Sequence, residues 1–130
     1  MLKNRIFTIT FIGWMVCITS LSLFSFSDLD TGSLNIPYAD KIVHFSFYFG
    51  FVVLGYLSLR ERKPMTPLRY VSVLILVIQA VLFGIGIEGL QHILTENRMA
   101  EYGDAFANAV GACFGGLAIG WYFSKREPLK

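Results

Sequence analysis

The sequence predicts an all-α integral membrane protein with four transmembrane helices, organised as a single domain over residues 1–130. Hydrophobic residues make up 55 % of the chain and charged residues 15 %, and the mean hydropathy is +0.58. A soluble domain of this size does not need so much apolar surface. The apolar residues also gather in four long runs without an amphipathic period, which is typical of helices that face lipid as well as one another.

The first apolar run covers residues 6–26 and follows Lys3 and Arg5. At ~1.5 Å per residue it reaches roughly 30 Å, enough to cross the hydrocarbon core of a bilayer. A basic start is also typical of a signal peptide, and residues 25–27 form a weak small-x-small cleavage site. Because the run exceeds the ~7–15 apolar residues usual for a signal peptide, we expect it to remain as an anchor.

The second predicted span, residues 42–59, opens with charged groups. Asp40 and His44 are four residues apart and therefore share one face of a helix, with Asp40 suited to the helix start. Lys41 lies between them. This spacing allows a carboxylate to hold an imidazole in one tautomer at the mouth of the span.

The third predicted span, residues 70–94, follows a basic loop that contains two prolines. Its far end is rich in glycine and carries Glu88, Gln91 and His92. Glu88 is three residues from Gln91 and four from His92, so one helix face concentrates these polar groups.

The fourth predicted span, residues 104–123, begins with Asp104 and Asn108, again four residues apart. Small residues then recur every four positions at Ala107, Gly111 and Gly115. Such a stripe allows helix backbones to approach closely, either within one chain or between two copies in a homo-oligomer.

The distribution of Lys and Arg predicts the orientation. Nine of these eleven residues lie at the N-terminus, in the loop 60–69 and in the C-terminal tail, whereas only Lys41 and Arg98 belong to the other side. The positive-inside rule therefore places both termini in the cytoplasm and the polar ends of the spans near the outer face. The net charge of +2 and the lack of a basic patch with interleaved aromatics exclude nucleic acid as a partner.

This topology brings polar groups from three spans to the same depth. An acid inside a span costs about 2.5–3.5 kcal/mol unless it faces a partner or water, so we expect Arg98 to pair with Glu88 or Asp104. We predict one connected outer network with Lys41 at its rim, formed by Asp40, His44, Glu88, Gln91, Arg98, Asp104 and Asn108.

Simpler interpretations exist for several of these residues. Asp40 and Asp104 could serve as helix N-caps, and Gln91 and Asn108 could bond across helices. His92, near the end of a span, fits an interfacial position. We expect no metal or other cofactor, because two histidines without a dense ligand motif are a weak signal.

The same residues carry a resemblance to a known family. In chain order they read Asp40-Lys41-x-x-His44-Phe45-x-x-Tyr48-Phe49, Gly55, Glu88-x-x-Gln91, Arg98 and Asp104-x-x-x-Asn108-x-x-Gly111-x-x-x-Gly115. Over residues 40–120 this pattern resembles that of VanZ-like membrane proteins, although the segment between Gln91 and Asp104 is short and lacks a proline. The resemblance implies a small multi-pass protein of the bacterial cytoplasmic membrane and cell envelope. The family is named for a member associated with teicoplanin resistance, an antibiotic resistance, and its biochemical activity is generally unassigned.

Two functions are compatible with these features. A binding protein would hold a membrane lipid headgroup, a lipid-linked precursor or a lipophilic glycopeptide antibiotic at the outer polar cluster. A membrane-embedded enzyme acting on a lipid-linked substrate would use Glu88 or His44 as general acid or base. We favour binding, because the sequence supplies partners for its charges but no evident nucleophile.

Overall fold

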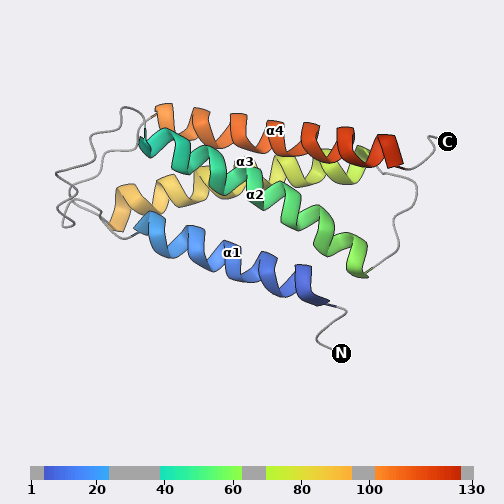
Figure 1. Ribbon diagram of the computed structural model, residues 1–130. Helices are drawn as coiled ribbons and strands as arrows, with labels where there is room; N and C mark the ends of the chain where they lie inside the picture. The colour runs from blue at the N-terminus through green and yellow to red at the C-terminus, as the bar shows by residue number, and fades with distance from the viewer. Residues whose placement is uncertain (1–4, 24–38, 63–69, 95–101, 127–130) are drawn as a thin grey trace.

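The computed structural model describes residues 5–23, 39–62, 70–94 and 102–126, and these ranges are helical. The helices are α1 (Ile6–Leu23), α2 (Ala39–Arg62), α3 (Tyr70–Leu94) and α4 (Tyr102–Arg126). Successive helices run in opposite directions, so the start of α1 and the end of α4 lie at the same end of the bundle (Figure 1). Each helix is long and apolar enough to cross a membrane. The predicted fold class, an all-helical membrane protein with four spans, is confirmed.

The helices extend beyond the apolar runs that predicted them. The third has the predicted bounds, whereas α2 covers 39–62 instead of 42–59 and α4 covers 102–126 instead of 104–123. The predicted end of the first span, at residue 26, falls outside the described residues. Backbone hydrogen bonds continue through polar flanks that a hydropathy pattern leaves out. Asp40 and Asp104 therefore lie inside the first turns of their helices.

The outer surface of the bundle is covered with large apolar side chains. On α3, Val71 is 70 % exposed, Leu82 61 % and Ile93 78 %. Contiguous exposed apolar surface of this extent is rare in soluble monomers. Lipid is the environment that matches it, and the protein is a multi-pass membrane protein.

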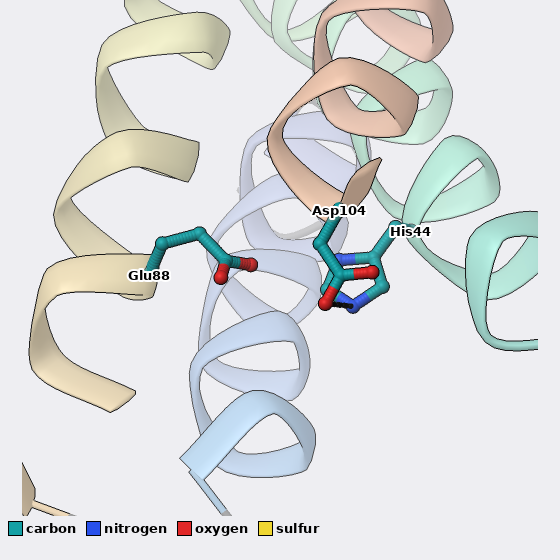
Figure 2. Close-up of side chains that lie close together, drawn as sticks. All are labelled: His44, Glu88 and Asp104. Carbon is teal, nitrogen blue, oxygen red and sulfur yellow. Dashed lines mark ion pairs between the residues drawn. The ribbon is translucent and has the colours of Figure 1, made fainter. Parts of the chain in front are cut away.

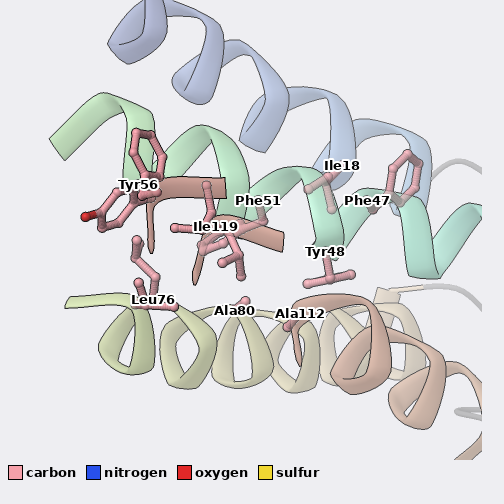
Figure 3. Packing of buried hydrophobic residues seen from close by; sticks show 12 residues of the cluster. Ile18, Phe47, Tyr48, Phe51, Tyr56, Leu76, Ala80, Ala112 and Ile119 are labelled. Atoms are coloured by element: carbon pink, nitrogen blue, oxygen red, sulfur yellow. The ribbon is translucent and has the colours of Figure 1, made fainter. Parts of the chain in front are cut away.

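The interior is built around α2, which packs against each of the other helices and most extensively against α4. Tyr48, Val52 and Tyr56 of α2 are almost completely buried, and Ile18 of α1 is buried with them. Figure 3 shows how Ile18, Tyr48 and Tyr56 meet residues of α3 and α4, among them Ala80, in one continuous core. α1 packs on α2 and α3 at the edge of the bundle.

Glycines allow α2 and α4 to approach each other closely. A Cβ added at Gly111 would lie 2.9 Å from the Cα of Phe45, with the Phe45 carbonyl oxygen closer still. A Cβ at Gly115 would lie 2.9 Å from the carbonyl oxygen of Phe49. Gly111 and Gly115 thus form a backbone-to-backbone contact within one chain, whereas Ala107 of the same stripe lines a surface groove.

A side chain from the end of α2 caps the start of α1. The backbone N–H groups of Phe7 and Thr8 donate to the two carboxylate oxygens of Glu61, at 2.9 and 2.8 Å. The Thr8 hydroxyl also donates to Glu61. Further along α1, the indole N–H of Trp14 donates to the carbonyl oxygen of Phe47 at 2.8 Å. These bonds fix α1 against α2 at two heights.

Candidate functional site

Polar side chains from α2, α3 and α4 meet at the end of the bundle where α2 and α4 begin. His44, Glu88 and Asp104 come from different helices and are all buried. Their side chains point toward one another in Figure 2. One nitrogen or oxygen ligand atom from each lies within 4.8 Å of the other two. We call these three residues the buried triad.

Lys41 of α2 reaches the triad from its outer edge. Its Nζ donates a hydrogen bond to Asp104 Oδ1, and the two groups form an ion pair. The lysine stem passes over the first turn of α4 at Gly103, where an added Cβ would lie 3.0 Å from Lys41 Cε. The Lys41 side chain remains 30 % exposed, so it lies between the triad and the surroundings.

His44 is held by α4 on one side of its ring. His44 Nδ1 lies 2.9 Å from Asn108 Oδ1. A carbonyl oxygen only accepts hydrogen bonds, so Nδ1 donates and carries a proton. In the neutral imidazole the other nitrogen, Nε2, then offers a lone pair. Nε2 lies 3.7 Å from Asp104 Oδ2, which is too long for a hydrogen bond.

Glu88 lies on α3, one helical turn beyond Gly84. Because Gly84 has no side chain, Tyr48 of α2 and Asn108 of α4 can approach the backbone of α3 one turn before Glu88. A Cβ at that position would lie 3.1 Å from Asn108 Nδ2 and 3.2 Å from the ring of Tyr48. Within the described part of the chain, Asn108 Nδ2 and the Tyr48 hydroxyl are buried and have no hydrogen-bond partner.

The remaining predicted residues have different positions. The Gln91 amide is buried and donates to the Ser22 carbonyl oxygen, a bond that ties α3 to α1. His92 is exposed on the outside of α3. Arg98 and the side chain of Asp40 lie outside what the structure describes, so the predicted pairing of Arg98 with an acid stays a prediction.

Two features could not be read from the sequence. Lys41 was expected at the rim of the network, and the structure adds that its partner is Asp104. Tyr48 belongs to the motif and is completely buried against Gly84 of α3. Its burial could not be predicted from the sequence, because Tyr48 lies in a run of aromatic residues that all look alike. The spacing of Lys41 and His44 within one helix says nothing about which side chain of α4 each will meet.

An apolar groove opens beside the ion pair. It has a volume of about 440 Å³ and runs between α2 and α4. Its lining is formed by Lys41, Ile42, Phe45, Gly103, Phe106, Ala107 and Val110. Phe106 is 72 % exposed and Ile42 58 %, so the groove faces the surroundings of the bundle. The groove therefore combines an ammonium at one end with apolar walls along its length.

Comparisons of this chain with protein-family profiles, with curated proteins and with solved structures gave no match.

Proposed function

We propose that this protein is a VanZ-like protein of the bacterial cytoplasmic membrane that binds an anionic amphiphile, a phosphate ester carried on an apolar chain. The observation that carries this proposal is the groove between α2 and α4, whose apolar walls end at the ammonium of Lys41. Membrane phospholipids and lipid-linked envelope precursors share this ligand chemistry. Both are partners that a protein of the cell envelope meets.

Charge and shape complementarity support the proposal. An ammonium has three N–H donors, and a partly exposed lysine can contact an anionic headgroup without leaving Asp104. Phe45 and Phe106 offer flat apolar surface to an acyl or prenyl chain. A phosphate that replaces water at Lys41 gains a charge-assisted hydrogen bond in a region of low dielectric constant.

The arrangement of charge along the bundle supports binding at the outer face. Arg5, Arg60, Arg62 and Lys125 belong to the end of the bundle opposite to Lys41. The positive-inside rule assigns that basic end to the cytoplasm. The groove and the triad then lie toward the outer leaflet, where envelope precursors and lipophilic glycopeptides are encountered.

The test is ligand retention measured by native mass spectrometry on purified protein. The protein is offered phosphatidylglycerol, a polyprenyl-pyrophosphate-linked precursor, a zwitterionic phospholipid and a lipophilic glycopeptide in separate samples. We expect the phosphate-bearing anionic lipids to be retained over the zwitterionic one, and the first two samples distinguish phospholipid from precursor. Retention of the glycopeptide alone, or equal retention of all four, would contradict the proposal.

Matched variants locate the binding site. Lys41→Gln removes a charge-assisted hydrogen bond worth ~1.5–3 kcal/mol, so the affinity that sets retention should fall roughly 10- to 150-fold. Lys125→Gln, which removes a lysine at the other end of the bundle, is the control and should bind like the wild type. Ala107→Phe fills the groove but leaves the ion pair in place, and it should also reduce retention. Unchanged retention in both groove variants would overturn the proposal.

A second candidate, an enzyme acting on a lipid-linked substrate, is favoured by the buried triad itself. His44 and Glu88 lie close enough to share proton transfer at one substrate atom. Mass spectrometry of the same lipid-linked samples would reveal a product. Turnover that Glu88→Gln or His44→Ala abolishes would replace the binding function with a catalytic one.

A further inference from the structure

We propose that the buried triad of His44, Glu88 and Asp104 binds one divalent transition-metal cation, of the Zn²⁺ or Mn²⁺ type. This inference goes beyond amphiphile binding and does not rest on it. It also departs from the expectation drawn from the sequence, where two histidines without a dense motif gave no metal site. The ligands come from three different helices, an arrangement that no local spacing can display.

The distances within the triad match those between ligands of one ion. At metal–ligand distances of ~2.0–2.2 Å, tetrahedral geometry places neighbouring ligand atoms about 3.4 Å apart. His44 Nε2 and Asp104 Oδ2 are 3.7 Å apart, and all three ligand atoms lie within 4.8 Å of one another. Sub-ångström side-chain adjustments would bring them to ligating distance.

The outer contacts orient two of the three ligands. The hydrogen bond from His44 Nδ1 to Asn108 Oδ1 makes Nδ1 the protonated nitrogen, so Nε2 is the atom that would ligate the cation. A metal-ligating histidine almost always donates its second N–H to an oxygen in this way. Lys41 occupies Asp104 Oδ1, and the other carboxylate oxygen faces His44 Nε2. Carboxylates that ligate metals are usually hydrogen-bonded in the same way, as Asp104 is by Lys41.

Burial makes a cation between the two acids favourable. Glu88 and Asp104 are 7 % and 8 % exposed, and they bring two carboxylates close together inside a membrane bundle. Burying carboxylates together is unfavourable unless positive charge accompanies them, and Lys41 brings one such charge to Asp104. A divalent ion would add two positive charges at the point where both acids converge.

The donor set indicates which ions fit. One imidazole nitrogen and two carboxylate oxygens suit Zn²⁺, Mn²⁺ or Fe²⁺, whereas Ca²⁺ and Mg²⁺ prefer oxygen ligands alone. Three protein ligands leave at least one position open for water or another oxygen ligand.

The test is metal content and affinity of the full chain, purified without a polyhistidine tag. The protein is treated with a chelator, freed of it, and titrated separately with Zn²⁺ and Mn²⁺ by calorimetry, with bound metal measured by mass spectrometry of the elements. We expect one Zn²⁺ or Mn²⁺ per chain and a higher thermal unfolding midpoint with metal. Absence of stoichiometric uptake by the wild-type protein would overturn the proposal.

Variants assign the ligands. His44→Ala and Glu88→Gln should each lower affinity by more than 10-fold, and Asn108→Ala, which loosens the histidine, by about 10- to 100-fold. His92→Ala removes the other histidine, which is exposed, and should bind like the wild type. Equal affinity in His44→Ala and His92→Ala contradicts the assignment. Helical content is followed by circular dichroism, and a folded Asn108→Ala with unchanged affinity would also refute it.

Discussion

The contact between Gly111 and the backbone of Phe45 predicts that Gly111→Ala destabilises the bundle. A methyl group at Gly111 would lie 2.9 Å from the Cα of Phe45, whereas ordinary contacts begin at 3.4 Å. The two helices must therefore part by more than about 0.5 Å along their closest line, because the Phe45 carbonyl oxygen lies closer still and neither atom belongs to a flexible side chain. Overpacking of this kind costs about 1–3 kcal/mol.

Helix propensity works in the opposite direction, since alanine favours a helix over glycine by up to ~1 kcal/mol. Because backbone atoms oppose the added methyl group, the overpacking cost lies in the upper part of its range, and we expect a net loss of about 1–2 kcal/mol, roughly a 5- to 30-fold change in the folded-to-unfolded ratio. The measurement is reversible unfolding in mixed detergent micelles, followed by circular dichroism.

Gly86→Ala is the matched control, because nothing lies within 4 Å of a Cβ at Gly86. This variant should be as stable as the wild type or slightly more stable. If Gly111→Ala and Gly86→Ala unfold within about 0.5 kcal/mol of each other, close packing of α2 on α4 is not what holds the bundle together.

Two further predictions concern the attachment of α1. Glu61→Gln replaces a carboxylate that accepts from two backbone N–H groups, so the first turn of α1 should be less stable and should exchange its amide hydrogens faster. Unchanged exchange at Phe7 and Thr8 would show that the cap does not form. Trp14→Phe removes the hydrogen bond to the Phe47 carbonyl and should cost about 1 kcal/mol in thermal or detergent unfolding. Trp121→Phe, on the exposed surface of α4, should leave stability unchanged, and equal effects of the two would refute the role of the indole N–H.

The fold was predictable because long apolar runs leave few alternatives. The bounds of α3 follow from its hydropathy alone, since Tyr70 and Leu94 mark abrupt changes in composition. The start of α2 does not follow from hydropathy, because Asp40 and Lys41 are polar residues in a helix that begins before the apolar run. A hydropathy pattern detects the environment of side chains, and it does not detect where backbone hydrogen bonding ends.

The candidate site was predictable only helix by helix. Spacing placed His44, Glu88 and Asp104 at a common depth, and the structure brings them together. The rotation of each helix about its axis decides which groups meet, and it depends on glycines such as Gly84 that admit a neighbouring side chain. Gln91 bonds across helices, which was one of its two interpretations, but its position in the sequence did not indicate that the partner would be the backbone of α1.

The location of Asp104 and Asn108 on the last helix has a consequence for biogenesis. Synthesis delivers α2 and α3 to the membrane before α4, so His44 and Glu88 enter the bilayer ahead of the residues that α4 contributes around them. α4 is also the least apolar of the four spans. Its insertion thus depends more than that of the others on docking into a groove already formed by α2 and α3. A chain truncated before α4 would present two acid- or imidazole-bearing helices to lipid, where ionisable groups without a partner are costly.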